Sequence, residues 1–214
     1  MKNTIIFDMD GTLLNTLEDI AGGVNHTMRQ YGLPQRRLEE VRCAVGNGAR
    51  RLIAAFVPGG EENPCLEQIL QDYEAYYETH CQIRTRAYDG ILEMLRQLKA
   101  RQVKMAIVSN KGDGAVKELT RLYFSEYIAA SQGVRDGIRK KPAPDSVLEA
   151  LNILGSRPEE TLYVGDSEVD YHTAVNAGVD CVLVSWGFRE REKLRQLQPD
   201  YLIDVPEELL SLCK

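Results

Sequence analysis

Short apolar runs rich in β-branched residues recur along this chain and alternate, over most of its length, with segments of helical periodicity. Continuous runs of this length are typical of strands that are buried on both faces, as in a parallel sheet. The runs lie at residues 4–7, 103–108, 127–130, 161–164, 181–184 and 201–203. Their alternation with helical segments predicts an α/β fold with right-handed crossovers.

The alternation is interrupted once, between the first strand and a second strand that begins near Val103. This interval contains only helical patterns, whose apolar stripes begin near Leu17, Leu38, Leu52 and Leu66. Glycine and proline clusters separate the stripes, as expected between helices. The interval therefore predicts a separate helical subdomain over the sheet. The alternative is that these helices only cover one face of the sheet.

The charge balance and the cysteines limit the possible partners and compartment. Lys and Arg number 26 and Asp and Glu 32, which gives a formal charge of −6. This acidic balance leaves no electrostatic footprint for nucleic acid, and no basic run suggests a membrane surface. No apolar stretch approaches the roughly 18 residues of a membrane span, and the N-terminal residues do not have the pattern of a signal peptide. The five cysteines are odd in number and contain no CxxC pair, which predicts reduced thiols in a cytoplasmic protein.

Polar side chains follow three of the predicted strands at the point where each strand ends. Ligands of open α/β sheets bind at the carboxyl ends of the strands. If these three strands are neighbours, their polar side chains converge at one edge of the sheet. The segments are Asp8-Met9-Asp10-Gly11-Thr12, Ser109-Asn110-Lys111 and Gly165-Asp166-Ser167, with Asp170 four residues after Asp166.

The carboxylates among these residues predict a magnesium site. Asp8 and Asp10 would repel each other at a strand end, and a divalent cation relieves this repulsion. Mg²⁺ prefers a few carboxylate oxygens and keeps positions for water and phosphate, and Asp166 would complete the ligand set. Gly11 allows the backbone to approach a ligand closely and can direct an amide toward it. The alternative for the first segment is an ordinary turn rich in Asp and Gly.

A cation is available from the segment around Lys141, which directly precedes Pro142. Proline fixes the backbone after the lysine, and Pro144 followed by Asp145 predicts a helix start. Lys141 could therefore reach an anionic ligand at the sheet edge. By itself, a lysine before proline is more often a solvated surface residue.

Together these residues resemble the haloacid dehalogenase superfamily of phosphatases, whose four motifs occur here in order over nearly the whole chain. The motifs are DxDGT at residues 8–12, the hydroxyl residue at Ser109, the lysine at Lys141 and GDSxxD at residues 165–170. The resemblance implies a parallel Rossmann-like core sheet with helices on both faces and a small all-helical cap inserted after the first strand. The core would comprise residues 1–13 and 85–214, and the cap residues 14–84.

The chain is most similar to the phosphoglycolate phosphatase branch of this superfamily. Four segments carry this similarity, at residues 45–49, 108–111, 141–145 and 163–167. The branch usually has Thr where this chain has Ser109, and both residues keep the hydroxyl group.

The resemblance implies the following roles at the reacting phosphoryl group. Asp8 attacks phosphorus and becomes an aspartyl phosphate, and Asp10 protonates the leaving oxygen and then helps to deprotonate water. Ser109 and Lys141 neutralise the phosphoryl oxygens. Residues expected to assist in binding the substrate are Asn110, Gly11 and Thr12.

Magnesium is implied as the cofactor, held by the Asp8 side chain, the Asp10 carbonyl oxygen and Asp166. Asp170 is included in the metal site, either as a ligand or as a residue that orients Lys141 or a metal-bound water. The alternative for Asp170 is an acidic residue at a helix N-terminus that interacts with the helix dipole.

The cap is expected to set the specificity for a small phosphorylated metabolite. Gly46, Asn47 and Arg50 belong to a turn that would face the active site, and Arg50 would suit the carboxylate of phosphoglycolate. The alternative is that Arg50 is an ordinary surface residue. Other substrates that remain open are pyrophosphate, small sugar phosphates and nucleotide monophosphates, and the oligomeric state cannot be inferred.

Three rival functions are considered. A phosphomutase of the β-phosphoglucomutase type carries a histidine twelve residues beyond the nucleophile, where this chain has Ile20, and His26 is out of phase on a helix. A dehalogenase would not need the second acid, Asp10. A non-catalytic binding or regulatory protein with this fold would be expected to lose motif residues, and all four motifs are intact.

Overall fold

The computed structural model describes residues 2–213, so the outer limits of the expected core, residues 1 and 214, lie outside the described residues. A six-stranded sheet forms its centre, in the order β5-β4-β1-β6-β7-β8, and all neighbouring strands pair in parallel. The strands are β1 (Thr4–Phe7), β4 (Lys104–Gly112), β5 (Ala130–Val134), β6 (Thr161–Gly165), β7 (Asp180–Val184) and β8 (Tyr201–Ile203). This arrangement confirms the predicted parallel α/β fold.

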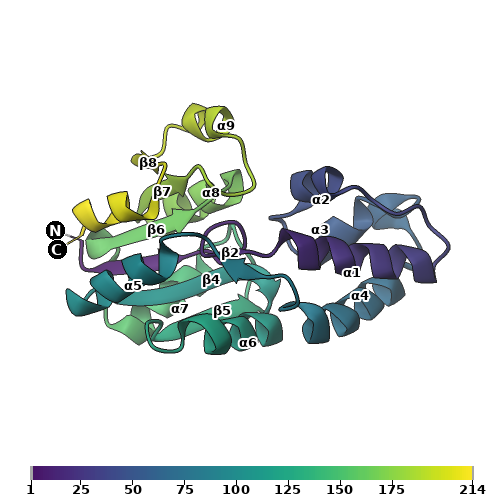
Figure 1. Ribbon diagram of the computed structural model, residues 1–214, viewed down its shortest axis with the longest axis horizontal. Coiled ribbons are helices and arrows are strands. Elements are labelled where there is room, and N and C mark those ends of the chain that lie inside the picture. The colour runs from purple at the N-terminus through teal and green to yellow at the C-terminus, as the bar shows by residue number, and fades with distance from the viewer. Residues whose placement is uncertain (1, 214) are drawn as a thin grey trace.

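Helices cover both faces of the sheet because alternate side chains of each strand point in opposite directions. In β1, Ile5 and Phe7 pack on one face and Ile6 on the other, and all three are fully buried. The first face is covered by α5 (Ile91–Ala100) and α6 (Asp113–Phe124). The second is covered by α7 (Asp145–Leu154), α8 (Glu168–Ala177) and the short α9 (Arg191–Gln196) (Figure 1).

The helices within residues 17–80 lie beyond one end of the sheet, on the side opposite the two termini (Figure 1). A two-stranded antiparallel ribbon, β2 (Leu14–Asn15) and β3 (Arg86–Ala87), forms where the chain leaves the sheet and returns to it. The helices between them are α1 (Leu17–Gln30), α2 (Leu38–Ala44), α3 (Ala49–Ala54), η1 (Gly60–Glu62) and α4 (Leu66–His80). We propose that residues 14–84, which begin at β2 and end just before β3, form a cap domain.

The cap helices form because each carries an apolar stripe at helical spacing that buries against another helix. Ile20, Val24 and Met28 of α1 are buried in the same cluster as Ile69 and Tyr73 of α4. The stripes of α1 and α4 thus bury each other's apolar side chains. Their buried residues belong to the same apolar cluster as the first face of the sheet.

Two predicted strands have limits that differ from the observed ones by more than one residue. The strand expected at 127–130 begins only at Ala130 and continues to Val134, and Tyr127 lies in a turn. The apolar pattern fails there because β5 is an edge strand of Ala, Ser, Gln, Gly and Val. The strand expected at 103–108 extends to Gly112, with a shift of register against β5 between Val108 and Gly112.

None of the helices in residues 2–213 combines the length and apolar character needed to cross a bilayer.

Candidate active site

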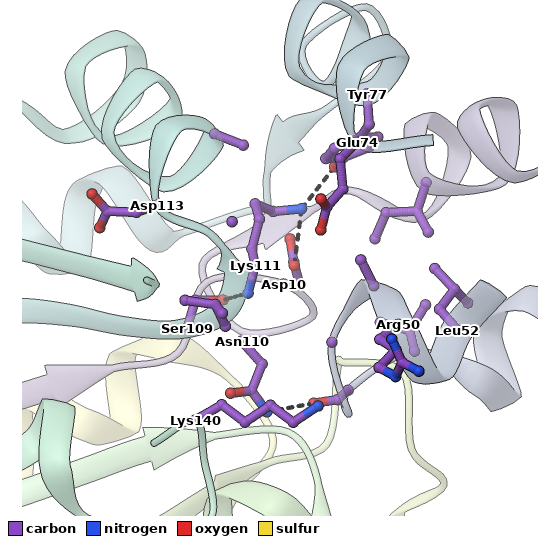
Figure 2. A pocket seen from close by; sticks show the side chains of 18 of the residues that line it. Asp10, Arg50, Leu52, Glu74, Tyr77, Ser109, Asn110, Lys111, Asp113 and Lys140 are labelled. Atoms are coloured by element: carbon purple, nitrogen blue, oxygen red, sulfur yellow. Dashed lines mark hydrogen bonds and ion pairs between the residues drawn. The ribbon is translucent and has the colours of Figure 1, made fainter. Parts of the chain in front are cut away.

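The polar segments at the carboxyl ends of β1, β4 and β6 meet at one edge of the sheet, because β4 and β6 are the two neighbours of β1. A cavity of about 570 Å³ lies there between the sheet edge and the cap helices, a size suited to a small-molecule ligand. Figure 2 shows side chains from both sides pointing into this space. The predicted residues that line it include Asp8, Asp10, Ser109, Asn110 and Asp166.

Asp8 and Asp170 share the ammonium group of Lys141. Lys141 Nζ lies 2.9 Å from Asp8 Oδ1 and 2.8 Å from Asp170 Oδ1. It also donates a hydrogen bond of 2.9 Å to the hydroxyl of Tyr163, a fully buried residue of β6. Burial alone would lower the pKa of Lys141, but the negative charges of Asp170 and Asp8 outweigh it and raise the pKa. Lys141 is therefore a fixed buried cation, and not the surface residue of the alternative interpretation.

The second oxygen of Asp170 fixes the start of helix α8. Asp170 Oδ2 accepts hydrogen bonds from the amides of Asp166 and Ser167, at 3.2 and 3.1 Å, and from the Ser167 hydroxyl at 2.6 Å. Both interpretations of Asp170 thus apply, since one oxygen orients Lys141 and the other satisfies N–H groups at a helix N-terminus. With both oxygens engaged and no exposed surface, Asp170 is better suited to positioning than to direct metal ligation.

The acidic side chains at this edge fit a divalent cation. Oxygen atoms of Asp8, Asp166 and Asp170 all lie within 4.8 Å of one another. Burial raises the pKa of Asp8 to about 7, and Asp170 and Asp10 act in the same direction while Lys141 opposes them. Burial, together with the charges of Asp170 and Asp8, also raises the pKa of Asp166. Buried carboxylates that repel one another in this way are stabilised by a bound cation.

Gly11 makes room for the Asp166 carboxylate. A Cβ atom at Gly11 would lie 2.2 Å from Asp166 Oδ2, and its φ of +81° also favours glycine. On its other side, Asp166 Oδ2 accepts a hydrogen bond of 2.6 Å from the Phe188 amide. The donor set and this cradle both fit a hard cation such as Mg²⁺.

Asp10 points away from that acidic cluster. Its Oδ1 accepts a hydrogen bond of 2.7 Å from the Thr16 hydroxyl, and its Oδ2 lies 3.0 Å from Lys111 Nζ. Lys111 in turn donates a hydrogen bond of 2.7 Å to the hydroxyl of Tyr77 on cap helix α4 (Figure 2). The Asp10 side chain is therefore free of the metal cluster, which leaves its backbone carbonyl as the possible ligand.

Ser109, Asn110 and Lys111 lie where β4 shifts its register against β5. Bulges of this kind redirect side chains next to active sites. Ser109 is buried and its hydroxyl accepts a hydrogen bond of 3.3 Å from the Lys111 amide. The Asn110 amide group donates to the carbonyl oxygens of Gly46 and Lys141, both at 3.1 Å. Asn110 thus links the core to the cap.

Gly11 and Thr12, two of the residues expected to assist in binding the substrate, are not among the residues that line the cavity. The Gly11 amide donates to the Leu14 carbonyl at 2.9 Å, so it is already paired within the turn. Thr12 is buried, its hydroxyl has no partner among the described residues, and its carbonyl accepts a hydrogen bond of 3.0 Å from the Trp186 indole. Both residues shape the turn that carries Asp8 and Asp10.

The cap turn faces the cavity as expected, but Arg50 already has anionic partners. Gly46, Gly48 and Arg50 line the cavity. Arg50 forms ion pairs with Glu61, at 3.0 Å, and with Glu67. Asn47 contributes its backbone carbonyl, which accepts a hydrogen bond of 3.1 Å from Lys140 of the core. The guanidinium charge of Arg50 is therefore balanced inside the cap.

Several residues at the site were given no role by the sequence. Lys111 belongs to a segment that carries the family similarity, and Lys140 stands next to Lys141, so both had a local signal. Tyr77 is one of several tyrosines in the apolar stripe of α4, and Phe188 follows no recognised motif. Tertiary contacts bring these residues to the site.

Comparisons with known proteins agree with this geometry. The family model for haloacid dehalogenase-like hydrolases matches residues 5–184. A phosphoglycolate phosphatase of Pseudomonas putida is 32% identical over 220 residues, covering 100% of this chain and 80% of that protein. The pyrophosphatase PpaX of Bacillus cereus is 30% identical over 211 residues, covering 98% of this chain and 95% of that protein.

A solved structure supports the same conclusion at the level of the fold. A protein of Lactobacillus delbrueckii subsp. bulgaricus, assigned as a phosphoglycolate phosphatase, superposes with a TM-score of 0.91 and 31% identity, over 98% of this chain and 97% of that one. The chain therefore belongs to the haloacid dehalogenase-like hydrolase family, and it is a phosphatase similar over its whole length to phosphoglycolate phosphatases.

Proposed function

We propose that the protein is a Mg²⁺-dependent phosphatase of a small phosphorylated metabolite, with 2-phosphoglycolate as the first candidate, and that it acts through an aspartyl phosphate on Asp8. The observation that carries this proposal is the position of Asp8, which lines the cavity, contacts Lys141 at 2.9 Å and belongs to the cluster of three carboxylates. A nucleophilic carboxylate needs neighbouring positive charge to approach a phosphate dianion.

The Asp8 side chain, the Asp10 carbonyl oxygen and Asp166 would hold the metal ion. When bound, Mg²⁺ supplies positive charge that neutralises the phosphoryl oxygens and offsets the repulsion among the carboxylates. Asp170 supports this site through Lys141 and through the amides of Asp166 and Ser167.

Asp8 and Asp10 divide the chemistry between them. An oxygen of Asp8 forms a bond to phosphorus while the bond to the leaving oxygen breaks, and Asp10 gives that oxygen its proton. Asp10 then accepts a proton from the water that hydrolyses the aspartyl phosphate, which regenerates both residues. Thr16 and Lys111 hold the two oxygens of Asp10 in one orientation through this cycle.

Ser109 and Lys141 stabilise the phosphoryl oxygens. Both are buried, Ser109 in β4 and Lys141 on the loop before α7. Fixed donors in such a water-poor site are worth more than donors in bulk solvent. Asn110 assists by joining the Lys141 backbone to the cap turn at Gly46.

The cap domain of residues 14–84 excludes bulk water and contacts the part of the substrate that is not phosphate. Gly46, Gly48 and Arg50 line the cavity on its cap side, which supports a role of this turn in specificity. Exclusion of water protects an aspartyl phosphate until the acid–base group directs a single water to it.

The choice of substrate rests on the relatives and on one position in the cavity. The relatives include phosphoglycolate phosphatases and a pyrophosphatase, so pyrophosphate is the second candidate. Ile20 lines the cavity and is buried. An apolar side chain at the position where a mutase needs histidine argues against a phosphomutase. Five unpaired cysteines support a cytoplasmic location as part of this proposal.

A phosphate-release screen tests the proposal. The purified protein is assayed with 2-phosphoglycolate, pyrophosphate, sugar phosphates and nucleotide monophosphates, with Mg²⁺ and with EDTA. We expect hydrolysis that EDTA abolishes and added Mg²⁺ restores, with the highest kcat/KM for 2-phosphoglycolate. Full activity in EDTA would reject the role of the metal, and a higher kcat/KM for another phosphate compound would replace the proposed substrate.

A further inference from the structure

Five cationic side chains line the cavity, and they differ in whether a carboxylate balances them. They are Arg50, Lys111, Arg135, Lys140 and Arg189. Arg50 pairs with Glu61 and Glu67, and Lys111 pairs with Asp10. The remaining two arginines pair with glutamates of the core, Arg135 with Glu149 and Arg189 with Glu168. Among residues 2–213, Lys140 is the member of this set that has no carboxylate within 4.0 Å.

The groups around Lys140 leave one positive charge in excess. Arg50 and Arg51 of α3 and the Lys140 ammonium are three cations, and Glu61 and Glu67 are two anions, so the local balance is +1. Burial is the largest cause that lowers the pKa of Lys140, and the positive charge of Arg51 acts in the same direction. A ligand with one additional negative charge would complete the cluster.

Lys140 also has donors to offer in the right place. An ammonium group carries three N–H donors, and the structure uses one of them for the Asn47 carbonyl at 3.1 Å. A Cβ atom at Gly48 would lie 3.8 Å from Lys140 Nζ and 3.3 Å from the Asn110 carbonyl. The ammonium therefore stands beside the segment that carries Ser109 and Asn110, and Figure 2 shows it between that segment and the cap turn.

We propose that Lys140 binds the second anionic group of the substrate, the carboxylate of a phosphorylated carboxylic acid or the leaving phosphate of pyrophosphate, and that it sets the preference for such substrates over uncharged phosphomonoesters. Arg50, whose charge is already balanced, supports the cap turn instead. The assignment rests on the proposed function and names the residue that recognises the substrate class. Lys140 is a binding residue here and takes no part in the transfer of the phosphoryl group.

Steady-state kinetics with three substrates test this assignment. The substrates are 2-phosphoglycolate, pyrophosphate and the uncharged-tail ester 2-hydroxyethyl phosphate. The variants are Lys140→Ala, Lys140→Arg, Arg50→Ala and the control Arg139→Ala. For Lys140→Ala we expect KM to rise about tenfold for at least one of the two doubly anionic substrates and less than about twofold for 2-hydroxyethyl phosphate, with kcat little changed. Lys140→Arg keeps a cation at this position and should restore most of the wild-type preference for the doubly anionic substrates.

The controls separate recognition from structural support. Arg139 is a neighbouring exposed cation that lies outside the cavity lining and pairs with Asp145 at 2.7 Å, and Arg139→Ala should leave the ratio of the KM values within about twofold. A selective loss confined to 2-phosphoglycolate or to pyrophosphate supports the assignment and identifies which anion Lys140 binds. An equal loss for all three substrates from Lys140→Ala, or a selective loss from Arg50→Ala instead, overturns it. If the wild-type protein hydrolyses none of the three, the proposed function fails first and this assignment fails with it.

Discussion

Lys111 and Asp10 form an ion pair of 3.0 Å between side chains that are only 5% and 14% exposed. The same ammonium donates to the Tyr77 hydroxyl at 2.7 Å and lies 4.4 Å from the centre of that ring. Tyr77 belongs to cap helix α4, whereas Asp10 and Lys111 belong to the core. One buried cation thus connects the proposed acid–base residue to the cap.

Loss of this cation should slow turnover more than it weakens substrate binding. Lys111→Met leaves one Asp10 oxygen without its partner, and a hydrogen bond to a charged group contributes about 1.5–3 kcal/mol. We therefore expect kcat to fall roughly tenfold to a hundredfold, and Tyr77→Phe to give a smaller loss in the same direction. Tyr73→Phe is the matched control, because the Tyr73 ring stacks on Tyr77 at 5.6 Å and the substitution keeps that contact. Unchanged kcat in Lys111→Met would contradict the role given to Lys111.

A methyl group at Gly11 should weaken magnesium binding. It would collide with the Asp166 carboxylate, where a Cβ atom would lie 2.2 Å from Oδ2. Displacement of a metal ligand or its support typically costs about 10–100-fold in metal affinity. The measurements are the Mg²⁺ concentration for half-maximal activity and the Mg²⁺-induced rise in Tm.

Gly32→Ala controls for backbone strain in this experiment. Gly32 also has positive φ, +64°, but a Cβ atom there would meet nothing within 4 Å. Both variants should lose some stability for conformational reasons, while only Gly11→Ala should lose the response to Mg²⁺. Equal Mg²⁺ responses in the two variants would show that Gly11 does not serve the metal site.

The metal-free protein should lose stability through Asp8 as the pH rises. The pKa of Asp8 is raised to about 7 in the folded protein from 3.8, so the folded state retains a proton that the unfolded chain releases. The contribution of Asp8 to the free energy of unfolding therefore falls between about pH 4 and 7 and stays low above that window. Asn cannot ionise, so Asp8→Asn should gain stability relative to the wild-type protein over this range.

Urea unfolding in EDTA at pH 4 and at pH 7.5 tests this prediction. The quantity compared is the free energy of unfolding of the wild-type protein and of Asp8→Asn at each pH. The free energy of unfolding of Asp8→Asn should rise relative to that of the wild-type protein. At about 1.36 kcal/mol per pKa unit, the upper bound of this rise is about 4 kcal/mol. Added Mg²⁺ should remove much of it, because a bound cation favours the ionised carboxylate. A stability difference between wild type and Asp8→Asn that does not change with pH would contradict the raised pKa.

The fold was largely predictable because its strands are buried on both faces. β1 and β8 have the predicted limits, and β4, β6 and β7 lie within a few residues of them. The edge strand β5 was displaced in the prediction because Ser131, Gln132 and Gly133 give no apolar signal. The apolar pattern also does not identify α8, because its buried face includes Asp170 and Thr173 along with small apolar residues.

The residues that strand order brings together could be predicted from the sequence. The hydrogen-bond and ion-pair partners of the individual side chains could not. A parallel sheet brings the ends of β1, β4 and β6 together, so Asp8, Ser109 and Asp166 could be expected to meet. The sequence could not show that the Gly11 amide pairs with Leu14, or that Glu61 and Glu67 take up the charge of Arg50. Those outcomes depend on local geometry that residue spacing does not encode.

The central claim is that Asp8 carries the phosphoryl group, and mass spectrometry of acid-quenched turnover tests it most directly. The protein is mixed with Mg²⁺ and 2-phosphoglycolate, or with the best substrate of the screen, quenched in acid and digested. We predict one added phosphoryl group on the peptide that contains Asp8. We also predict no such adduct, and less than about 1% of wild-type turnover, in a folded Asp8→Asn variant. An adduct on another residue, or turnover in Asp8→Asn near the wild-type rate, would contradict the account.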